Sequence, residues 1–257
     1  MPTGAVRDTL NNSISKAITI LNSFSYERPR LRLKEVSALT GLNQATAYRM
    51  LLTLKEFNLI EQHEGFYSLG RGILRYEGIV LHSMEIRRTC LPYLAELSHQ
   101  LKANVNLAVL DGNEVVYVAR AETPYCLYGY FHIGMRRPIH CTALGKVLVS
   151  RTPEIIQEVF QGGVTRLTLN TKTSISEYME EIERVRLQGY ALDLEELCNG
   201  INCVAAPIYD ASGGIAAAIS ISGPTSIYPA EEIRSCVPAL IDYAHRLSAR
   251  MGSRGGW

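Results

Sequence analysis

Hydrophobic residues at helical spacing open the chain. They place one apolar face on a helix that runs from about Ser15 to Phe24. The residues of that face are Ala17, Ile20, Leu21 and Phe24. Pro29 follows and ends the run, because proline lacks a backbone donor and disfavours helix in the residue before it. A second, short helix is predicted from about Leu33 to Leu39.

The next residues predict a tight turn into a third helix. Gly41 can adopt the left-handed conformation that ends a helix, and Asn43 can cap the one that follows. In the third helix Ala47, Leu51 and Leu54 share the inward face. A short helix, a glycine turn and a longer helix are typical of a helix-turn-helix.

The outward face of this third helix carries side chains suited to reading DNA. Recognition helices present their N-terminal residues to base edges, where glutamine pairs with adenine, arginine with guanine and methyl groups contact thymine. Gln44, Thr46 and Arg49 fit that task, and Tyr48 lies at the flank. An ordinary solvated helix face has the same composition, so the helix alone leaves both interpretations open.

A hairpin behind the helix favours the DNA-binding interpretation. Strands are predicted at residues 59–62 and 66–69, and they flank the turn His63-Glu64-Gly65. Such a wing approaches the minor groove or the sugar-phosphate backbone, and we expect His63 at its tip to touch it. A histidine that is merely exposed is the alternative.

The rest of the chain predicts helices around a sheet. A connecting helix at 72–83 and a longer one at 86–101 precede two strands joined by a turn at 111–113. The expected strands are 104–110, 114–120, 203–209 and 215–222. The other expected helices are 142–150, 153–160, 174–188 and one running from Tyr228 towards Met251. This order predicts an α+β fold in which helices pack on an antiparallel sheet.

Composition and charge fit two domains with different partners. The 257 residues are 47% hydrophobic and 20% charged, enough for two cores. Residues 1–76 hold ten basic and six acidic residues, a balance of +4, whereas the remainder is −3. We predict a DNA-binding domain at 1–70, a linker helix at 71–83 and a larger domain at 84–257. With no signal peptide or membrane-spanning run, we expect a cytoplasmic protein without a membrane partner.

Six segments resemble one family, the IclR-type bacterial regulators. Residues 41–54 resemble its G-L-x-x-[ST]-x-x-R-L-L-x-x-L stretch, and 66–70 its wing ending in Y-x-L-G. Residues 138–146 are similar to P-x-H-x-x-A-x-G-K and 189–196 to G-Y-x-x-D-x-E-E, while 200–208 and 220–224 match two more segments. The order holds over roughly residues 13–250. Met50 stands where leucine is usual and Lys16 where arginine is common, which leaves the fine DNA contacts open.

The resemblance implies a GAF-like effector-binding domain with a pocket for a small organic molecule. The positions that match the family's pocket are Ala143, Leu144, Asp193, Cys203, Ser220 and Ser222. A helix beginning at Ala143 would favour an anion, and Ser220 and Ser222 lie on one strand face. The alternatives are serines that satisfy backbone groups, Cys203 as core filling and Asp193 as a solvated charge. We also place Lys16 among the expected DNA contacts.

An aromatic cluster precedes Gly134, and two interpretations of it stay open. It comprises Tyr125, Tyr128, Tyr130, Phe131 and His132. Stacking on an aromatic effector would make Tyr128 a contact, whereas packing at the sheet edge or between subunits would not. Gly145-Lys146 lacks the other glycines of a phosphate loop, so no nucleotide site is expected. The six cysteines form no C-x-x-C pair, which argues against a metal site, and no cofactor is expected.

The leading hypothesis is a dimeric, ligand-responsive transcriptional regulator that binds operator DNA. It would control a metabolic, and specifically catabolic, operon as repressor or activator, and would sense a small organic acid, aromatic acids included. Reading two half-sites requires a dimer or a dimer of dimers. A thiol enzyme using Cys203 or Cys141 lacks a positioned base, so we expect no enzyme. A DNA-binding scaffold that has lost its ligand is the third hypothesis.

Overall fold

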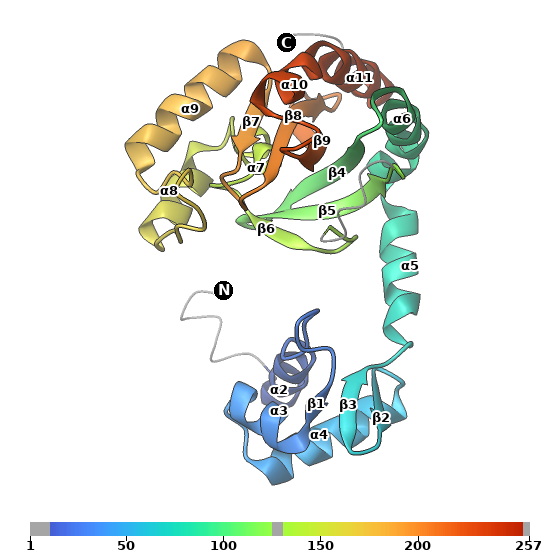
Figure 1. Ribbon diagram of the computed structural model, residues 1–257. Helices are drawn as coiled ribbons and strands as arrows, with labels where there is room; N and C mark the ends of the chain where they lie inside the picture. The colour runs from blue at the N-terminus through green and yellow to red at the C-terminus, as the bar shows by residue number, and fades with distance from the viewer. Residues whose placement is uncertain (1–10, 125–130, 254–257) are drawn as a thin grey trace. The chain divides into compact units, whose positions relative to one another are not determined.

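The computed structural model describes residues 11–124 and 131–253, and the chain forms two compact units (Figure 1). The first unit comprises Met1–Ser83 and the second Met84–Trp257. No helix within the described ranges is long and apolar enough to cross a membrane.

The first unit is a helix-turn-helix with a wing. Its helices are α2 (Asn12–Leu21), α3 (Leu33–Thr40), α4 (Gln44–Glu56) and α5 (Ile73–Ser83), and its strands are β1 (Leu31–Arg32), β2 (Ile60–His63) and β3 (Phe66–Leu69). The strands form an antiparallel sheet in the order β1-β3-β2. The core joins apolar residues from every element except α5: Ile20, Phe24, Leu31, Val36, Ala47, Leu51, Leu54, Ile60 and Tyr67.

Local signals placed the turn of this unit correctly. Gly41 ends α3 with a φ of 70°, and the Asn43 side chain accepts a hydrogen bond from the backbone N–H of Thr46 at 2.8 Å. The first helix differs from its prediction, because Asn11 caps it and α2 spans Asn12–Leu21 rather than 15–24. Phe24 lies beyond the helix and still reaches the core.

The second unit is built on one antiparallel sheet of six strands, in the order β6-β5-β4-β9-β8-β7 (Figure 1). The strands are β4 (Asn104–Asp111), β5 (Glu114–Ala121), β6 (Arg136–Pro138), β7 (Ala191–Leu194), β8 (Ile201–Tyr209) and β9 (Ile215–Pro224). Strands β4 and β9 are neighbours although more than a hundred residues separate them. The predicted strands are confirmed, whereas β6 and β7 are short and were not predicted.

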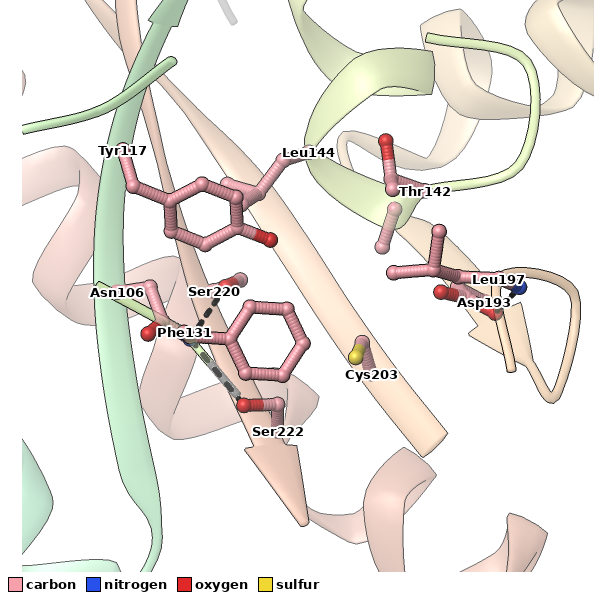
Figure 2. Close-up of a pocket in the computed structure, with 11 residues that line it drawn as sticks. Asn106, Tyr117, Phe131, Thr142, Leu144, Asp193, Leu197, Cys203, Ser220 and Ser222 are labelled. Carbon is pink, nitrogen blue, oxygen red and sulfur yellow. Dashed lines mark hydrogen bonds between the residues drawn. The ribbon is translucent and has the colours of Figure 1, made fainter. Parts of the chain in front are cut away.

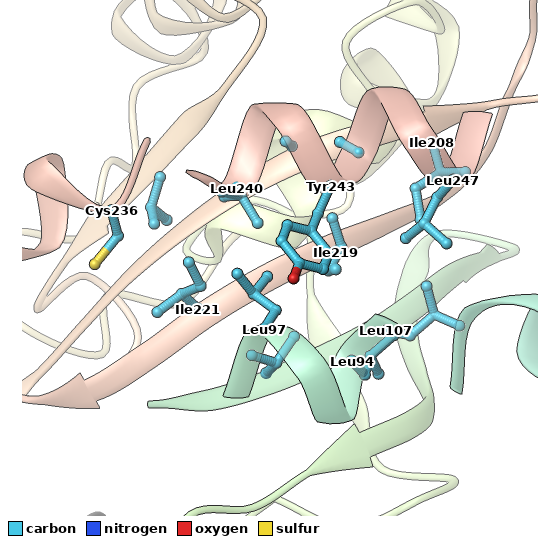
Figure 3. Close-up of a cluster of buried hydrophobic side chains, with 14 of the residues drawn as sticks. Leu94, Leu97, Leu107, Ile208, Ile219, Ile221, Cys236, Leu240, Tyr243 and Leu247 are labelled. Carbon is cyan, nitrogen blue, oxygen red and sulfur yellow. The ribbon is translucent and has the colours of Figure 1, made fainter. Parts of the chain in front are cut away.

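Helices cover both faces of this sheet. The helices are α6 (Glu85–Leu101), α7 (Ala143–Leu148), α8 (Pro153–Gln161), α9 (Ile175–Gln188), α10 (Ala230–Ser235) and α11 (Val237–Arg250). On one face α6 and α11 pack through Leu94, Leu97, Leu240 and Leu247, with Ile219 beneath them (Figure 3). On the other face α7, α8 and α9 enclose a second apolar cluster.

The last predicted helix is wrong in one respect. Instead of one helix from Tyr228 towards Met251, the chain forms α10 and α11, with Cys236 between them. Pro238 explains the break, since it has no N–H to donate and is accommodated only in the first turn of a helix.

Candidate functional site

The first turns of α4 form an exposed polar surface. Gln44, Tyr48 and Arg49 are exposed and Thr46 is half-buried, while Ala47 on the opposite side is fully buried. Helix α4 therefore packs by one face and leaves its N-terminal polar face to solvent. That arrangement is what a recognition helix requires, because its side chains must reach base edges.

The wing differs slightly from its predicted form. His63 is not in the loop: it is the last residue of β2 and pairs with Phe66. The turn consists of Glu64 and Gly65, both with positive φ, the backbone that two-residue hairpins favour. His63 remains exposed next to the tip, and Lys16 on α2 is half-buried.

A pocket lies between the sheet and the start of α7 in the second unit. Eleven residues line it: Asn106, Tyr117, Phe131, Thr142, Ala143, Leu144, Asp193, Leu197, Cys203, Ser220 and Ser222. The rings of Tyr117 and Phe131 lie on one side and Thr142 and Asp193 on the other, with Cys203 on the strand between them (Figure 2). The free space is about 10 Å³ for the centre of a water-sized sphere, which is room for about one water molecule.

All six positions taken from the family's pocket that the structure describes lie together in this lining. They come from α7, β7, β8 and β9. The predicted helix start is confirmed, since α7 begins at Ala143 behind the N-cap Thr142. Tyr128 lies outside the described residues, as do Tyr125 and Tyr130.

Asn106 on β4 organises the two serines, and sequence reasoning missed it. Its side-chain Nδ2 donates to Ser222 Oγ at 3.1 Å and to Ser220 Oγ at 3.4 Å (Figure 2). The serine hydroxyls thus interact with this side chain and point into the pocket. Asn106 Oδ1 is buried and has no hydrogen-bond partner among the described residues. A polar residue inside the apolar strand 104–110 was the available signal.

Asp193 is not a solvated charge, because only 2% of its surface is exposed. Its Oδ1 accepts from the backbone N–H of Glu196 at 2.7 Å and of Leu197 at 3.4 Å. Burial, and next the negative charge of Glu196, raise the pKa of Asp193 to about 7. At neutral pH this carboxyl can therefore exist in a protonated form that donates a hydrogen bond.

A buried ion pair lies behind Asp193, and Lys146 is its cation. Lys146 is fully buried, and its Nζ donates to Glu196 Oε1 at 2.5 Å and to the Leu192 carbonyl at 2.6 Å. Lys172, which is partly exposed, approaches the same Glu196 oxygen at 3.3 Å. Lys146 thus anchors the segment that carries Asp193, a role that its resemblance to a phosphate-loop lysine did not indicate.

The chemistry of a thiol enzyme is not supported by these surroundings. Burial raises the pKa of Cys141 to about 12 and that of Cys203 well above its usual value, whereas a nucleophilic cysteine needs a lowered pKa. Within residues 11–124 and 131–253, no group of three His, Cys, Asp or Glu side chains has the arrangement of a metal site.

Comparisons with known proteins agree with both units. Residues 13–64 match the family model of the IclR helix-turn-helix domain, and residues 78–249 match that of the bacterial transcriptional regulator IclR C-terminal domain. The Escherichia coli (strain K12) HTH-type transcriptional regulator XynR is 34% identical over 83% of this chain and 86% of its own.

Solved structures show the same fold. The crystal structure of Thermotoga maritima IclR is 27% identical, with a TM-score of 0.73 over 94% of this chain and 99% of that one. An IclR homolog from Microbacterium hydrocarbonoxydans, complexed with 4-hydroxybenzoate, is 20% identical, with a TM-score of 0.79 over 93% of this chain and 99% of that one; at this identity the likeness concerns the fold. The chain belongs to the IclR family of bacterial transcriptional regulators, non-enzymatic DNA-binding proteins with a helix-turn-helix and an effector-binding domain.

Proposed function

We propose that the effector of this regulator is a small organic acid, aromatic acids included, bound in the pocket beside α7. The observation that carries the proposal is the buried Asp193, whose pKa of about 7 lets it donate a hydrogen bond to a carboxylate. The hydroxyl protons of Ser220 and Ser222 add two donors, because both oxygens already accept from Asn106. Aromatic acids are included because Tyr117 and Phe131 supply ring surfaces.

The size of the pocket suggests how such a ligand acts on the rest of the protein. With room for about one water molecule, the described state cannot hold an acid of several non-hydrogen atoms unless lining residues move. An effector that binds only an opened state shifts the population towards that state. We propose that this shift changes how the recognition helices meet the operator, and that the regulated genes are those of a catabolic operon.

Effector affinity is expected to depend on pH. A bound carboxylate favours the protonated form of Asp193, so binding and protonation reinforce each other. The affinity for an organic acid should then be constant well below pH 7 and fall as the pH rises above it, by up to about tenfold per pH unit. Calorimetric titration of aromatic and short aliphatic acids between pH 6 and 8.5 measures this.

Asp193→Asn is the matched variant for that experiment. Asparagine keeps an oxygen that can accept from the Glu196 and Leu197 backbone, but it does not ionise. Its affinity should be independent of pH over the same range. A wild-type affinity that does not change with pH would argue against Asp193 as donor, and no binding of any acid would leave the scaffold without a ligand as the better hypothesis.

The DNA contacts proposed for the first unit are the exposed residues of α4 with the wing. Gln44, Thr46, Tyr48 and Arg49 are assigned to the major groove, and His63 to the neighbouring backbone or minor groove. Lys16 on α2 is assigned to phosphate. The polar face of α4 supports the first group, since it is free of packing within the unit.

We further propose that α5 is covered by a second copy of the chain in a homodimer, which can pair again as a dimer of dimers. This helix has no buried residue, although Tyr76, Ile79 and Val80 share one side of it at helical spacing. Each of these side chains is 57% or 58% exposed. Large apolar residues gathered on one face mark an association surface.

Ile79→Glu is expected to weaken the dimer, because it places a charge in an apolar interface. Sedimentation velocity at micromolar concentration should show a shift towards the monomer. His82→Glu introduces a negative charge on the opposite side of the same helix and should leave the association state unchanged. If Ile79→Glu sediments like the wild type, α5 does not form the interface.

A further inference from the structure

The effector pocket holds an acid but no base among its lining residues. Asp193 is the only ionisable carboxyl in the described lining, and no lysine or arginine is part of it. A carboxylate ligand that leaves water for this space therefore needs a positive charge nearby, since burying an unpaired charge is costly.

Arg137 on β6 lies on the pocket side of the sheet. It pairs with Val115 across the β5–β6 ladder, so both side chains are on the face that Tyr117 also occupies two residues along β5. Its guanidinium carbon is 5.9 Å from the centre of the Phe131 ring, and that ring lines the pocket. The positive charge also reaches Tyr117 and Cys141, where it opposes the rise in pKa that burial causes.

The guanidinium of Arg137 lacks an acceptor. Its Nε is buried and has no hydrogen-bond partner among the described residues. The next residue in the strand, Arg136, differs in this respect, because it lies on the other face and pairs with Asp111 and Glu114. A buried arginine nitrogen without a partner is rare in folded proteins and calls for a group that fills the place.

We propose that Arg137 is the anion anchor of the effector pocket and that it selects carboxylates over uncharged ligands of the same shape. This inference rests on the proposed effector site and adds its charge specificity. An arginine–carboxylate contact is charge-assisted and can be bidentate, so it is stronger than the neutral hydrogen bonds from Ser220 and Ser222. Phe131, stacked beside the guanidinium, would hold it towards the ligand.

The test compares acid and amide probes on the full chain by calorimetry at pH 6.5. The probes are 4-hydroxybenzoate with 4-hydroxybenzamide, and pyruvate with pyruvamide. Arg137→Gln is expected to weaken carboxylate binding by about 10- to 100-fold and to change amide binding by less than about threefold. Arg137→Lys should restore part of the lost affinity, because it returns the charge without the planar fork.

Arg136→Gln is the matched control, as it removes the same charge from the neighbouring residue on the opposite face. It should bind both probe types like the wild type. Equal carboxylate affinity in Arg137→Gln and wild type would overturn the role of Arg137 and leave the effector site standing. If the wild type binds none of these acids, the proposed effector class fails, and this inference fails with it. Thermal unfolding of each variant shows whether a loss of affinity reflects a loss of folding.

Discussion

Alanine at both Gln44 and Arg49 is expected to abolish specific operator binding. Both side chains are exposed in the first two turns of α4, where a recognition helix meets base edges. Each base contact of this kind contributes about 1 to 3 kcal/mol, so two lost contacts per subunit weaken binding by roughly 30-fold to 10⁴-fold. Binding of operator duplex, measured by fluorescence anisotropy at several salt concentrations, checks the expectation.

The fold of the first unit should survive this double change, because neither residue belongs to its core. Arg136→Gln serves as the control, since it alters the charge of the chain in the second unit and should bind the operator normally. Thr46→Ala alone should have a smaller effect, as Thr46 is half-buried. Unchanged affinity in the double variant would show that α4 is not the helix that reads the operator.

Lys146→Met is expected to destabilise the second unit by about 3 to 5 kcal/mol. The substitution leaves Glu196 buried without its cation, and removing one partner of a buried ion pair carries a penalty of this size. Lys172 approaches the same carboxylate but is partly exposed, so it cannot replace the buried charge. Denaturant unfolding followed by circular dichroism measures the loss.

The double variant Lys146→Met with Glu196→Leu separates charge from packing. Replacing both partners by apolar residues should recover most of the lost stability, since no buried charge then remains. Recovery stays incomplete because the Leu192 carbonyl still loses its donor. Lys172→Met should cost less than about 1 kcal/mol, as expected for an exposed pair. A single Lys146→Met that unfolds like the wild type would contradict this account of the pair.

Parts of the fold whose causes are local could be predicted from the sequence. The turn at Gly41, the cap at Asn43 and the inward residues of α4 all follow from interactions within a few residues. The wing was found for the same reason, although the position of His63 shifted by one place because the turn needs only two residues. The break at Cys236 was missed, since the helical pattern continues across it and only the placement of Pro238 decides.

The site could be predicted only in part. The family resemblance indicated Asp193, Cys203 and the serines on β9, and the structure brings them into one pocket. Asn106 was missed because its contact with Ser220 crosses from β4 to β9, over 114 residues of sequence. Lys146 was missed as well, since only packing reveals that a lysine is fully buried.

The sequence by itself determined the kind of protein: a helix-turn-helix with a wing, followed by a helix-covered antiparallel sheet of the IclR type. Periodicity, caps and turns suffice for this, because they act between neighbours along the chain. The tertiary structure decided the chemistry. The pKa of Asp193 and the unpaired Arg137 depend on burial and on charges brought from other strands, and no local pattern records these long-range effects.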